Sequence, residues 1–176
     1  GDILAPVAGL PGGAAARAAA MAVVEEEEAR GRQGMRLRAD ALRFLRALRD
    51  SGRVEKVALV TRNSAGAVEH LFEQPGMERA FFDRVISREH RYVKPDPELA
   101  RELCREWGMA PRNVLMLGDH RDDVACGFYA GCSTCLITSE EEWAALVADV
   151  DGFADTCHAA VTSLTAALEV MGLGPG

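Results

Sequence analysis

The sequence of 176 residues has few aromatic side chains (6%), no long apolar run and no excess of positive charge. No stretch reaches the roughly 18 uninterrupted apolar residues that indicate a transmembrane helix. The 20 Lys and Arg residues are outnumbered by 27 Asp and Glu residues, which leaves a net charge of −7. Such a chain lacks the basic face that nucleic-acid binding needs. We therefore expect no membrane span and no nucleic-acid partner.

The five cysteines are an odd number, and their spacing suggests no disulfide framework. This favours an intracellular, reducing compartment. Because the chain starts with Gly1 and not with Met, no targeting signal can be read in either direction. Cys132 and Cys135 form a Cys-x-x-Cys pair, but no second pair accompanies them. We interpret both as small apolar side chains entering a strand.

The chain does contain enough apolar residues, 48% of the total, for one sizeable core. From residue 57 onward, apolar runs typical of buried strands alternate with helical patterns. Strands are predicted over 57–60, 81–87, 114–117, 134–137 and 153–157. Helices are predicted over 14–30, 40–50, 65–73, 95–107, 122–130, 140–148 and 163–171. This order predicts an α/β fold, a doubly wound parallel sheet with helices on both faces.

Three acidic residues follow the predicted strand 114–117. Gly118 ends the strand, Asp119 comes next, and Asp122 and Asp123 lie within one further turn. Open α/β sheets build their sites at the carboxyl ends of strands. Three carboxylates this close repel one another unless a cation lies among them, and such hard oxygen ligands suit Mg²⁺. The alternative is that Asp119 and Asp122 only cap the following helix.

Two further side chains suit the same chemistry. Thr61 ends the strand 57–60, and a hydroxyl beside free N–H groups at a helix start favours an anion. Lys94 lies in a loop before a helix, and its ammonium is a good phosphate partner. With the acids they indicate a Mg²⁺-assisted phosphoryl site. Simpler roles are also open, because Thr61 could only cap a helix and Asp123 could only hold Lys94.

Three segments together resemble motifs II, III and IV of the haloacid dehalogenase (HAD) superfamily. They are Leu59 to Asn63 (LVTRN), Lys94 to Pro97 (KPDP) and Gly118 to Asp123 (GDHRDD), in the right order and at suitable spacing. The resemblance covers about residues 40–170. It implies a HAD-like Rossmannoid core, and most members of the family are Mg²⁺-dependent phosphatases acting on phosphorylated substrates.

The resemblance also implies roles for the residues before the acidic cluster. Thr61 binds the transferring phosphoryl group, and Arg62 and Asn63 contribute to substrate binding beside it. Lys94 stabilises charge on the phosphoryl group and on the nucleophile. Thr61 and Lys94 are thus the candidate catalytic residues of this chain.

For the acidic cluster, the resemblance implies a metal site. Asp119 is the direct Mg²⁺ ligand. Asp123 holds the metal site through water or through Lys94, and Asp122 shares that supporting role. His120 occupies a place that is often a serine in the family.

The family's motif I has no counterpart before Thr61. That motif is an Asp-x-Asp pair after a buried central strand, and it supplies the nucleophile and the general acid/base. Asp2 has no strand before it, and Asp40 falls in a predicted helix. We therefore expect motif I upstream of Gly1, with the first core strand absent from this chain, and no phosphoryl turnover by the chain alone.

Two alternatives remain for the function and the partners. In one, the chain belongs to a phosphatase that forms an aspartyl-phosphate on an upstream aspartate. In the other, it is a non-catalytic HAD-like domain that serves as a structural or assembly subunit, with a protein partner covering the missing strand. In either case we expect residues 1–50 to form a small helical cap region and linker, and residues 51–176 to form the core. His90 and Trp107 are interpreted as a surface residue and a helix-face residue.

Overall fold

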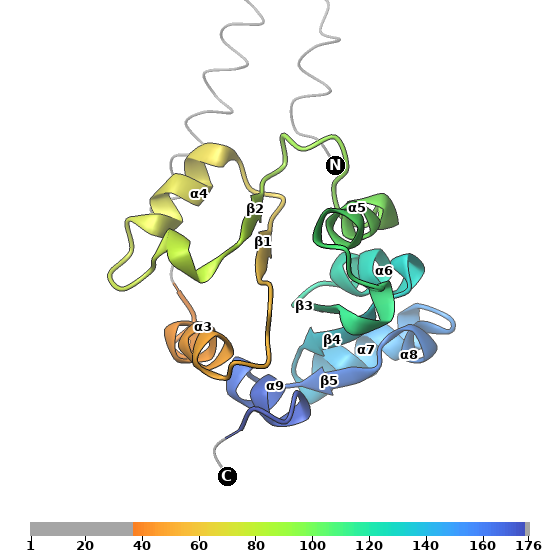
Figure 1. Cartoon of the computed structure of the whole chain (residues 1–176). Helices are drawn as coiled ribbons and strands as arrows, with labels where there is room; N and C mark the ends of the chain where they lie inside the picture. The colour runs from red at the N-terminus through yellow and green to blue at the C-terminus, as the bar shows by residue number, and fades with distance from the viewer. Residues whose placement is uncertain (1–36, 175–176) are drawn as a thin grey trace, which may run out of the picture.

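A computed structural model describes residues 37–174 of the chain (Figure 1). The helices are α3 (Ala41–Asp50), α4 (Ala65–Phe72), α5 (Pro97–Trp107), α6 (Arg121–Ala130), α7 (Glu140–Asp149), α8 (Phe153–Thr156) and α9 (Leu164–Val170), with 3₁₀ turns at Arg79–Phe81 and Pro111–Asn113. The strands are β1 (Ala58–Val60), β2 (Arg84–Ile86), β3 (Leu115–Gly118), β4 (Ser133–Ile137) and β5 (Ala159–Val161). The helix predicted over 14–30 lies outside the described residues.

The strands pair in parallel, but they form two sheets. β1 pairs with β2, and β3, β4 and β5 form the second sheet in that order. The α/β class and the parallel pairing are as predicted. The single sheet that the sequence predicted is not seen, because the strands of residues 37–174 form two separate sheets. β1 and β3 are the edge strands on either side of the division (Figure 1).

Helices α5 and α9 begin or end at residues with specific local roles. Asp96 caps α5 by accepting a hydrogen bond of 2.9 Å from the Glu98 N–H, and Pro97 fills the first turn. Gly108 ends α5 in the left-handed region, at φ 65°. Ser163 caps α9, as predicted, by accepting from the Ala166 N–H at 3.0 Å. Local sequence therefore fixes where these helices start and stop.

Two predicted strands differ from the structure. The segment 153–157 is not a strand, because Phe153–Thr156 forms helix α8 and the last strand is Ala159–Val161. The Phe153 side chain is buried against Val124 of α6 and Leu136 of β4, and the single helical turn of α8 places it there. The strand predicted over 81–87 begins later, at Arg84, because Phe81 belongs to a 3₁₀ turn. Short apolar runs do not distinguish a strand from a buried turn of helix.

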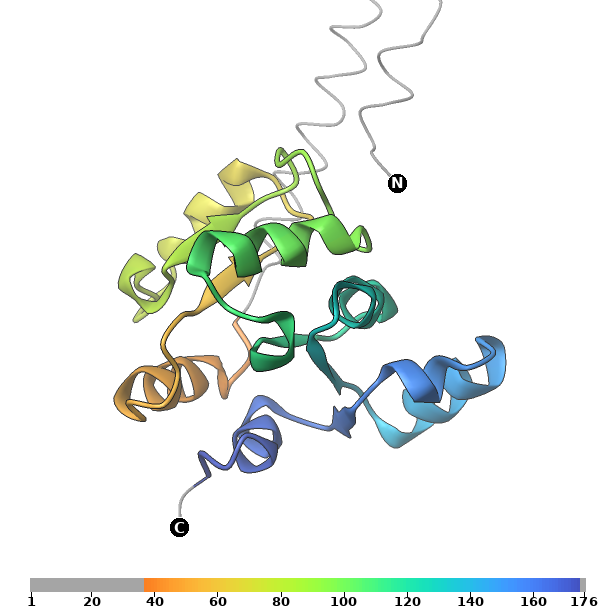
Figure 2. The ribbon, with the colours of Figure 1, turned by 45° about the vertical axis from the view of Figure 1, so that its right-hand side comes forward.

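Three apolar clusters cover the sheets, and the smallest contains Val124, Leu136 and Phe153. The two larger clusters lie in different places. One lies under α5 and α6 and includes Leu99, Leu103 and Cys126. The other lies between α3 and α9, which pack together near the C-terminal end of the described chain (Figure 2). α6 approaches β3 so closely that a Cβ at Gly127 would lie 2.5 Å from the Met116 Cβ. Within residues 37–174, no helix is long and apolar enough to cross a membrane.

Four of the five cysteines, Cys104, Cys126, Cys132 and Cys135, are buried in this core. Burial raises the pKa of Cys126 and Cys135 to about 11 and that of Cys132 to about 12. The thiolate is the reactive form of cysteine, so thiols this buried stay protonated and inert near neutral pH. The Cys-x-x-Cys pair accordingly packs as small apolar side chains, as expected.

We predict that these four thiols resist a thiol reagent in the native protein at about pH 7.5, because burial raises their pKa values and keeps the thiols protonated. Cys157, which is partly exposed, reacts first. The measurement is mass-mapped labelling before and after unfolding in urea, with Cys157→Ser as the control. Rapid native labelling of Cys132 or Cys135 would contradict this account of the pair.

Candidate functional site

A polar cavity of about 200 Å³ lies at the carboxyl ends of β1 and β3. It is lined by Thr61, Arg62, Asn63, Lys94, Asp119, His120, Asp122 and Asp123. Thr61 follows β1, Lys94 lies in the loop before α5, and the acids lie between β3 and the first turn of α6. The structure thus brings together every residue that the sequence analysis singled out for chemistry.

A buried ion pair forms the floor of this cavity. Lys94 Nζ lies 2.5 Å from Asp123 Oδ1 and donates a second hydrogen bond, of 3.1 Å, to the Val60 carbonyl. The Asp123 side chain is only 4% exposed, so its charge needs such a partner. The ammonium therefore links the end of β1 to the first turn of α6.

The first turn of α6 holds Asp123 from its other side. His120 is the N-cap, with its Nδ1 accepting from the Asp122 N–H at 3.2 Å. Asp123 Oδ2 accepts from the His120 N–H at 3.0 Å and completes the capping box. The alternative in which Asp119 and Asp122 cap this helix is therefore wrong. A Cβ at Gly118 would lie 2.1 Å from Asp123 Oδ2, so only glycine fits there.

The other two acids differ in their partners. Asp122 Oδ2 accepts a hydrogen bond of 2.7 Å from Arg62 Nη1, and this ion pair borders the cavity. Asp119 is exposed, and its carboxylate makes no hydrogen bond or ion pair with any residue between 37 and 174. One of the three carboxylates therefore remains available as a ligand.

This donor set fits Mg²⁺ in a particular way. The described residues contain no cluster of three or more metal-ligating side chains that would form a closed cage. Mg²⁺ usually keeps several waters and is held by one or two carboxylates together with substrate phosphate oxygens. Asp119 can supply one such carboxylate, whereas Asp122 and Asp123 are already paired with cationic side chains.

Thr61 is also available to a ligand. Its Oγ1 accepts the Asn63 N–H at 3.0 Å, which leaves the hydroxyl hydrogen free to donate. Helix α4 is capped by Ser64, whose Oγ accepts from the Ala67 N–H. The simpler role of Thr61 as the helix cap is therefore wrong.

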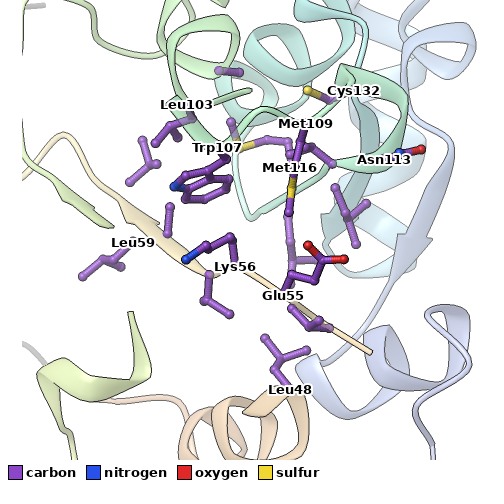
Figure 3. Close-up of a pocket in the computed structure, with 18 of the residues that line it drawn as sticks. Leu48, Glu55, Lys56, Leu59, Leu103, Trp107, Met109, Asn113, Met116 and Cys132 are labelled. Atoms are coloured by element: carbon purple, nitrogen blue, oxygen red, sulfur yellow. The ribbon is translucent and has the colours of Figure 1, made fainter. Parts of the chain in front are cut away.

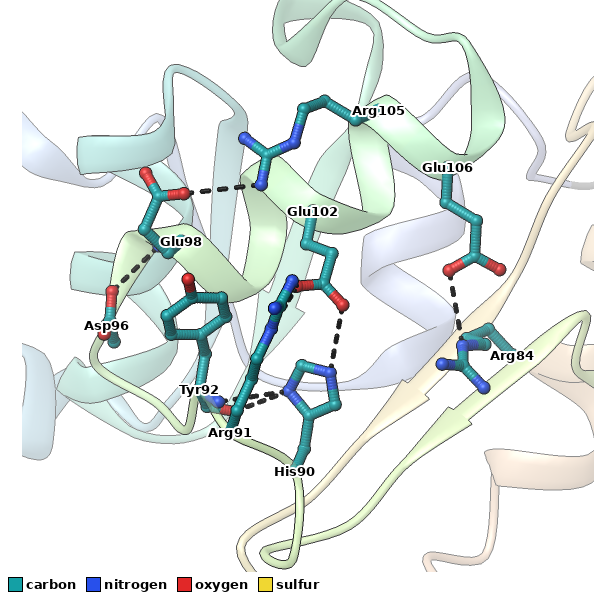
Figure 4. Close-up of polar contacts among 9 residues, drawn as sticks. All are labelled: Arg84, His90, Arg91, Tyr92, Asp96, Glu98, Glu102, Arg105 and Glu106. Carbon is teal, nitrogen blue, oxygen red and sulfur yellow. Dashed lines mark hydrogen bonds and ion pairs between the residues drawn. The ribbon is translucent and has the colours of Figure 1, made fainter.

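A polar network beside the site was not recognised in the sequence. Glu102 of α5 accepts a hydrogen bond of 2.9 Å from Arg91 Nε, and its other oxygen lies 3.2 Å from His90 Nε2 (Figure 4). These hydrogen bonds, Arg91's first, lower the pKa of the Glu102 carboxyl. His90 was interpreted as a surface residue, but its side chain is only 17% exposed.

This network anchors the loop that carries Lys94. Arg91 also lies over the Tyr92 ring, 4.9 Å from its centroid, and the Tyr92 N–H donates to His90 Nδ1 (Figure 4). The contacts join residues that are 11 and 12 positions apart, across a loop and a helix. No local pattern in the sequence signals them.

The chain is similar to several known proteins. A family model of haloacid dehalogenase-like hydrolases matches residues 9–131. A HAD phosphatase from Thermococcus onnurineus of known structure superposes with a TM-score of 0.65 over 86% of this chain and 65% of that one, at 20% identity. At that identity the superposition supports the fold alone.

Two curated proteins are similar in sequence. A haloacid dehalogenase-like hydrolase domain-containing protein of Arabidopsis thaliana is 37% identical over 89 residues, 50% of this chain and 35% of that protein. A phosphoglycolate phosphatase of Haemophilus influenzae is 30% identical over 94 residues, 53% of this chain and 41% of that protein. The chain spans less than half the length of these relatives. With the family match extending over more than half of its residues, the chain belongs to the haloacid dehalogenase-like hydrolases.

Proposed function

We propose that this chain supplies the phosphate- and metal-handling side chains of a Mg²⁺-dependent phosphatase that acts on a phosphate monoester. The observation that carries the proposal is the meeting of Thr61, Lys94 and Asp119 in one polar cavity at the strand ends. The phosphoglycolate phosphatase among the relatives supports the same reaction class. The substrate is a phosphorylated molecule that reaches this cavity.

The donors in the cavity favour a phosphoryl group as the ligand. Lys94 has three N–H donors, and two of them are engaged by Asp123 and the Val60 carbonyl. The third donor, with the Thr61 hydroxyl and the nearby Asn63 side chain, can bind phosphoryl oxygens. Charge-assisted hydrogen bonds of this kind orient the group and stabilise the charge that builds up on it.

Asp119 would hold Mg²⁺, with Asp122 and Asp123 supporting the site through their cationic partners. Bound Mg²⁺ would neutralise part of the negative charge on the phosphoryl group. Asp123 keeps Lys94 in place, and Arg62 keeps Asp122 from facing Asp119 as an unpaired charge. Among the described residues of the cavity, the Asp119 carboxylate is therefore free, and the two carboxylates near it are neutralised by Arg62 and Lys94.

The attacking carboxylate is not among these residues. We propose that it is an aspartate outside residues 1–176, which forms the aspartyl-phosphate. Most of the predicted cap region 1–50 lies outside the described residues. Metal-dependent hydrolysis of a phosphate monoester by this chain alone, abolished by Asp119→Ala, would overturn this part of the proposal. A chain that binds neither Mg²⁺ nor phosphate would favour the non-catalytic, assembly role instead.

We predict that Asp119→Asn weakens Mg²⁺ binding about tenfold or more, because the variant removes the one free carboxylate of the cavity. The measurement is calorimetric titration of the full chain with Mg²⁺. Asp149→Asn, the same change at an exposed position at the end of α7, is the matched control and should bind as the unmodified protein does. Equal affinity of the Asp119 variant and the unmodified chain would contradict the assignment.

We predict two effects of Lys94→Met. Binding of inorganic phosphate falls about tenfold or more, because a charge-assisted donor is lost. The free energy of unfolding, measured in urea, falls by about 3 kcal/mol, because Asp123 is left as a buried, unpaired charge. Lys56→Met is the matched control: that ammonium is 44% exposed beside Asp83, so its loss changes stability by less than about 1 kcal/mol. Unchanged phosphate binding in the Lys94 variant would contradict the role of this ammonium.

A further inference from the structure

The polar cavity has an inner end and an outer end. A larger cavity of about 730 Å³ lies between β1 and β3, and Leu59, Trp107 and Met116 are among the residues that line it (Figure 3). Lys94 and Asp123 line both cavities, so they mark the end of the polar cavity that adjoins the larger one. We call this the inner end. The six other described residues that line the polar cavity do not line the larger one, and they form its outer end.

Each end of the polar cavity contains one cationic side chain paired with one carboxylate of α6. At the inner end, Lys94 Nζ lies 2.5 Å from Asp123 Oδ1. At the outer end, Arg62 Nη1 donates a hydrogen bond of 2.7 Å to Asp122 Oδ2. Asp122 and Asp123 are successive residues of the first turn of α6. One helical turn therefore places two cations at different ends of the same cavity.

The two ion pairs differ in burial and in the number of their other contacts. The side chains of the inner pair are 15% and 4% exposed, whereas those of Arg62 and Asp122 are 47% and 21% exposed. Lys94 also donates to the Val60 carbonyl, and Asp123 also accepts from the His120 N–H. The Arg62 guanidinium makes no further hydrogen bond or ion pair with a residue between 37 and 174. Because an exposed ion pair contributes little to stability, the outer pair is the one that can open.

The start of α6 does not depend on the outer pair. His120 and Asp123 form the capping box of this helix, and neither of the two hydrogen bonds of that box involves Arg62. The simplest structural role for the Arg62–Asp122 contact, which is to fix the start of the helix, is therefore already filled by other residues.

The Arg62 guanidinium has donors to spare. It carries five N–H groups in a planar fork, and it donates a single hydrogen bond, to Asp122. The same fork can donate two parallel hydrogen bonds to a carboxylate or a phosphate. An oxyanion of a ligand at the outer end can therefore compete with Asp122 for this guanidinium.

We propose that Arg62 is a specificity-determining residue, which exchanges Asp122 for a second oxyanion of the substrate, either a carboxylate or a second phosphate. The substrate class is then a phosphate monoester that carries another anionic group a few bonds from the phosphoryl group. The phosphoryl group binds beside Lys94 and Thr61, and the second oxyanion binds at the outer end, to Arg62. This inference rests on the proposed function, because that function places the phosphoryl group beside Lys94.

The test compares three phosphonates, in which phosphorus is attached through carbon and cannot be released by ester hydrolysis. Ethylphosphonate has no second anionic group, phosphonoacetate has a carboxylate, and methylenediphosphonate has a second phosphonate. Each is titrated calorimetrically into the full chain at about pH 7.5 without Mg²⁺. We expect a ligand with a second oxyanion to bind about tenfold more tightly than ethylphosphonate. The ligand that does so identifies the second group as a carboxylate or a phosphate, and we call its affinity relative to ethylphosphonate the preference.

Two variants test the exchange from the protein side. Arg62→Gln should reduce the preference to about twofold or less, because the second oxyanion loses its partner. Asp122→Asn should raise the preference about threefold or more, because no carboxylate then competes for the guanidinium. Arg84→Gln is the matched control, since it removes a guanidinium that is 42% exposed and paired with Glu106 away from the cavity. That control should keep the preference of the unmodified chain, and circular dichroism checks the fold of each variant.

Equal affinity for all three phosphonates, or an unchanged preference in Arg62→Gln, would overturn the inference. A lower preference in Asp122→Asn would also overturn it, because Asp122 would then position Arg62 for the ligand instead of competing with it. If Arg62→Gln fails to fold, the Asp122 variant decides the question. Ethylphosphonate reports on the phosphoryl site alone. If it binds and the preference is absent, only this inference fails, whereas if no phosphonate binds, the proposed function fails as well.

Discussion

The ion pair between Lys94 and Asp123 is the contact on which the arrangement of the site depends. It lies where β1, the loop before α5 and the first turn of α6 meet, and Lys94 binds the Val60 carbonyl at the same time. A buried carboxylate is tolerated only when it is paired and hydrogen-bonded, and Asp123 has both an ammonium and the His120 N–H. The glycine at position 118 follows from this, because any side chain there would occupy the space of the Asp123 carboxylate. This one ion pair therefore accounts for the glycine at position 118, for the start of α6 and for the position of the Lys94 ammonium.

The distribution of charge explains how three acidic residues can lie close together at this strand end. Asp123 is neutralised by Lys94 and Asp122 by Arg62. Of the three carboxylates, Asp119 alone makes no hydrogen bond or ion pair with a residue between 37 and 174. A single free carboxylate binds a divalent cation weakly by itself and more strongly when a phosphate group shares the ion. Under the proposed function, such a site would take up Mg²⁺ together with the phosphate ester.

Much of this was predictable because the signals are local. The Ser163 cap of α9 and the acids after β3 are each identified by neighbouring residues, and the three motifs contain every residue of the polar cavity. The failures have a common cause, which is that the deciding contacts are distant in sequence. Phe153 adopts a helical turn because of where its ring packs, and His90 is half-buried because Glu102, twelve residues later, binds it. Which strands pair, β1 with β2 and β4 with both β3 and β5, could not be read from the apolar runs, because strand pairing is a tertiary property that a local pattern does not specify.

The polar cavity takes its residues from the ends of two strands that belong to different sheets. Thr61 directly follows β1, and Asp119 directly follows β3. Lys94 contacts both sides, because it binds the Val60 carbonyl of β1 and the Asp123 carboxylate of α6. Any ligand that bridges Thr61 and Asp119 adds a second contact between the same two strand ends. Ligand binding and the Lys94 contacts therefore stabilise each other, because coupling between two interactions is reciprocal.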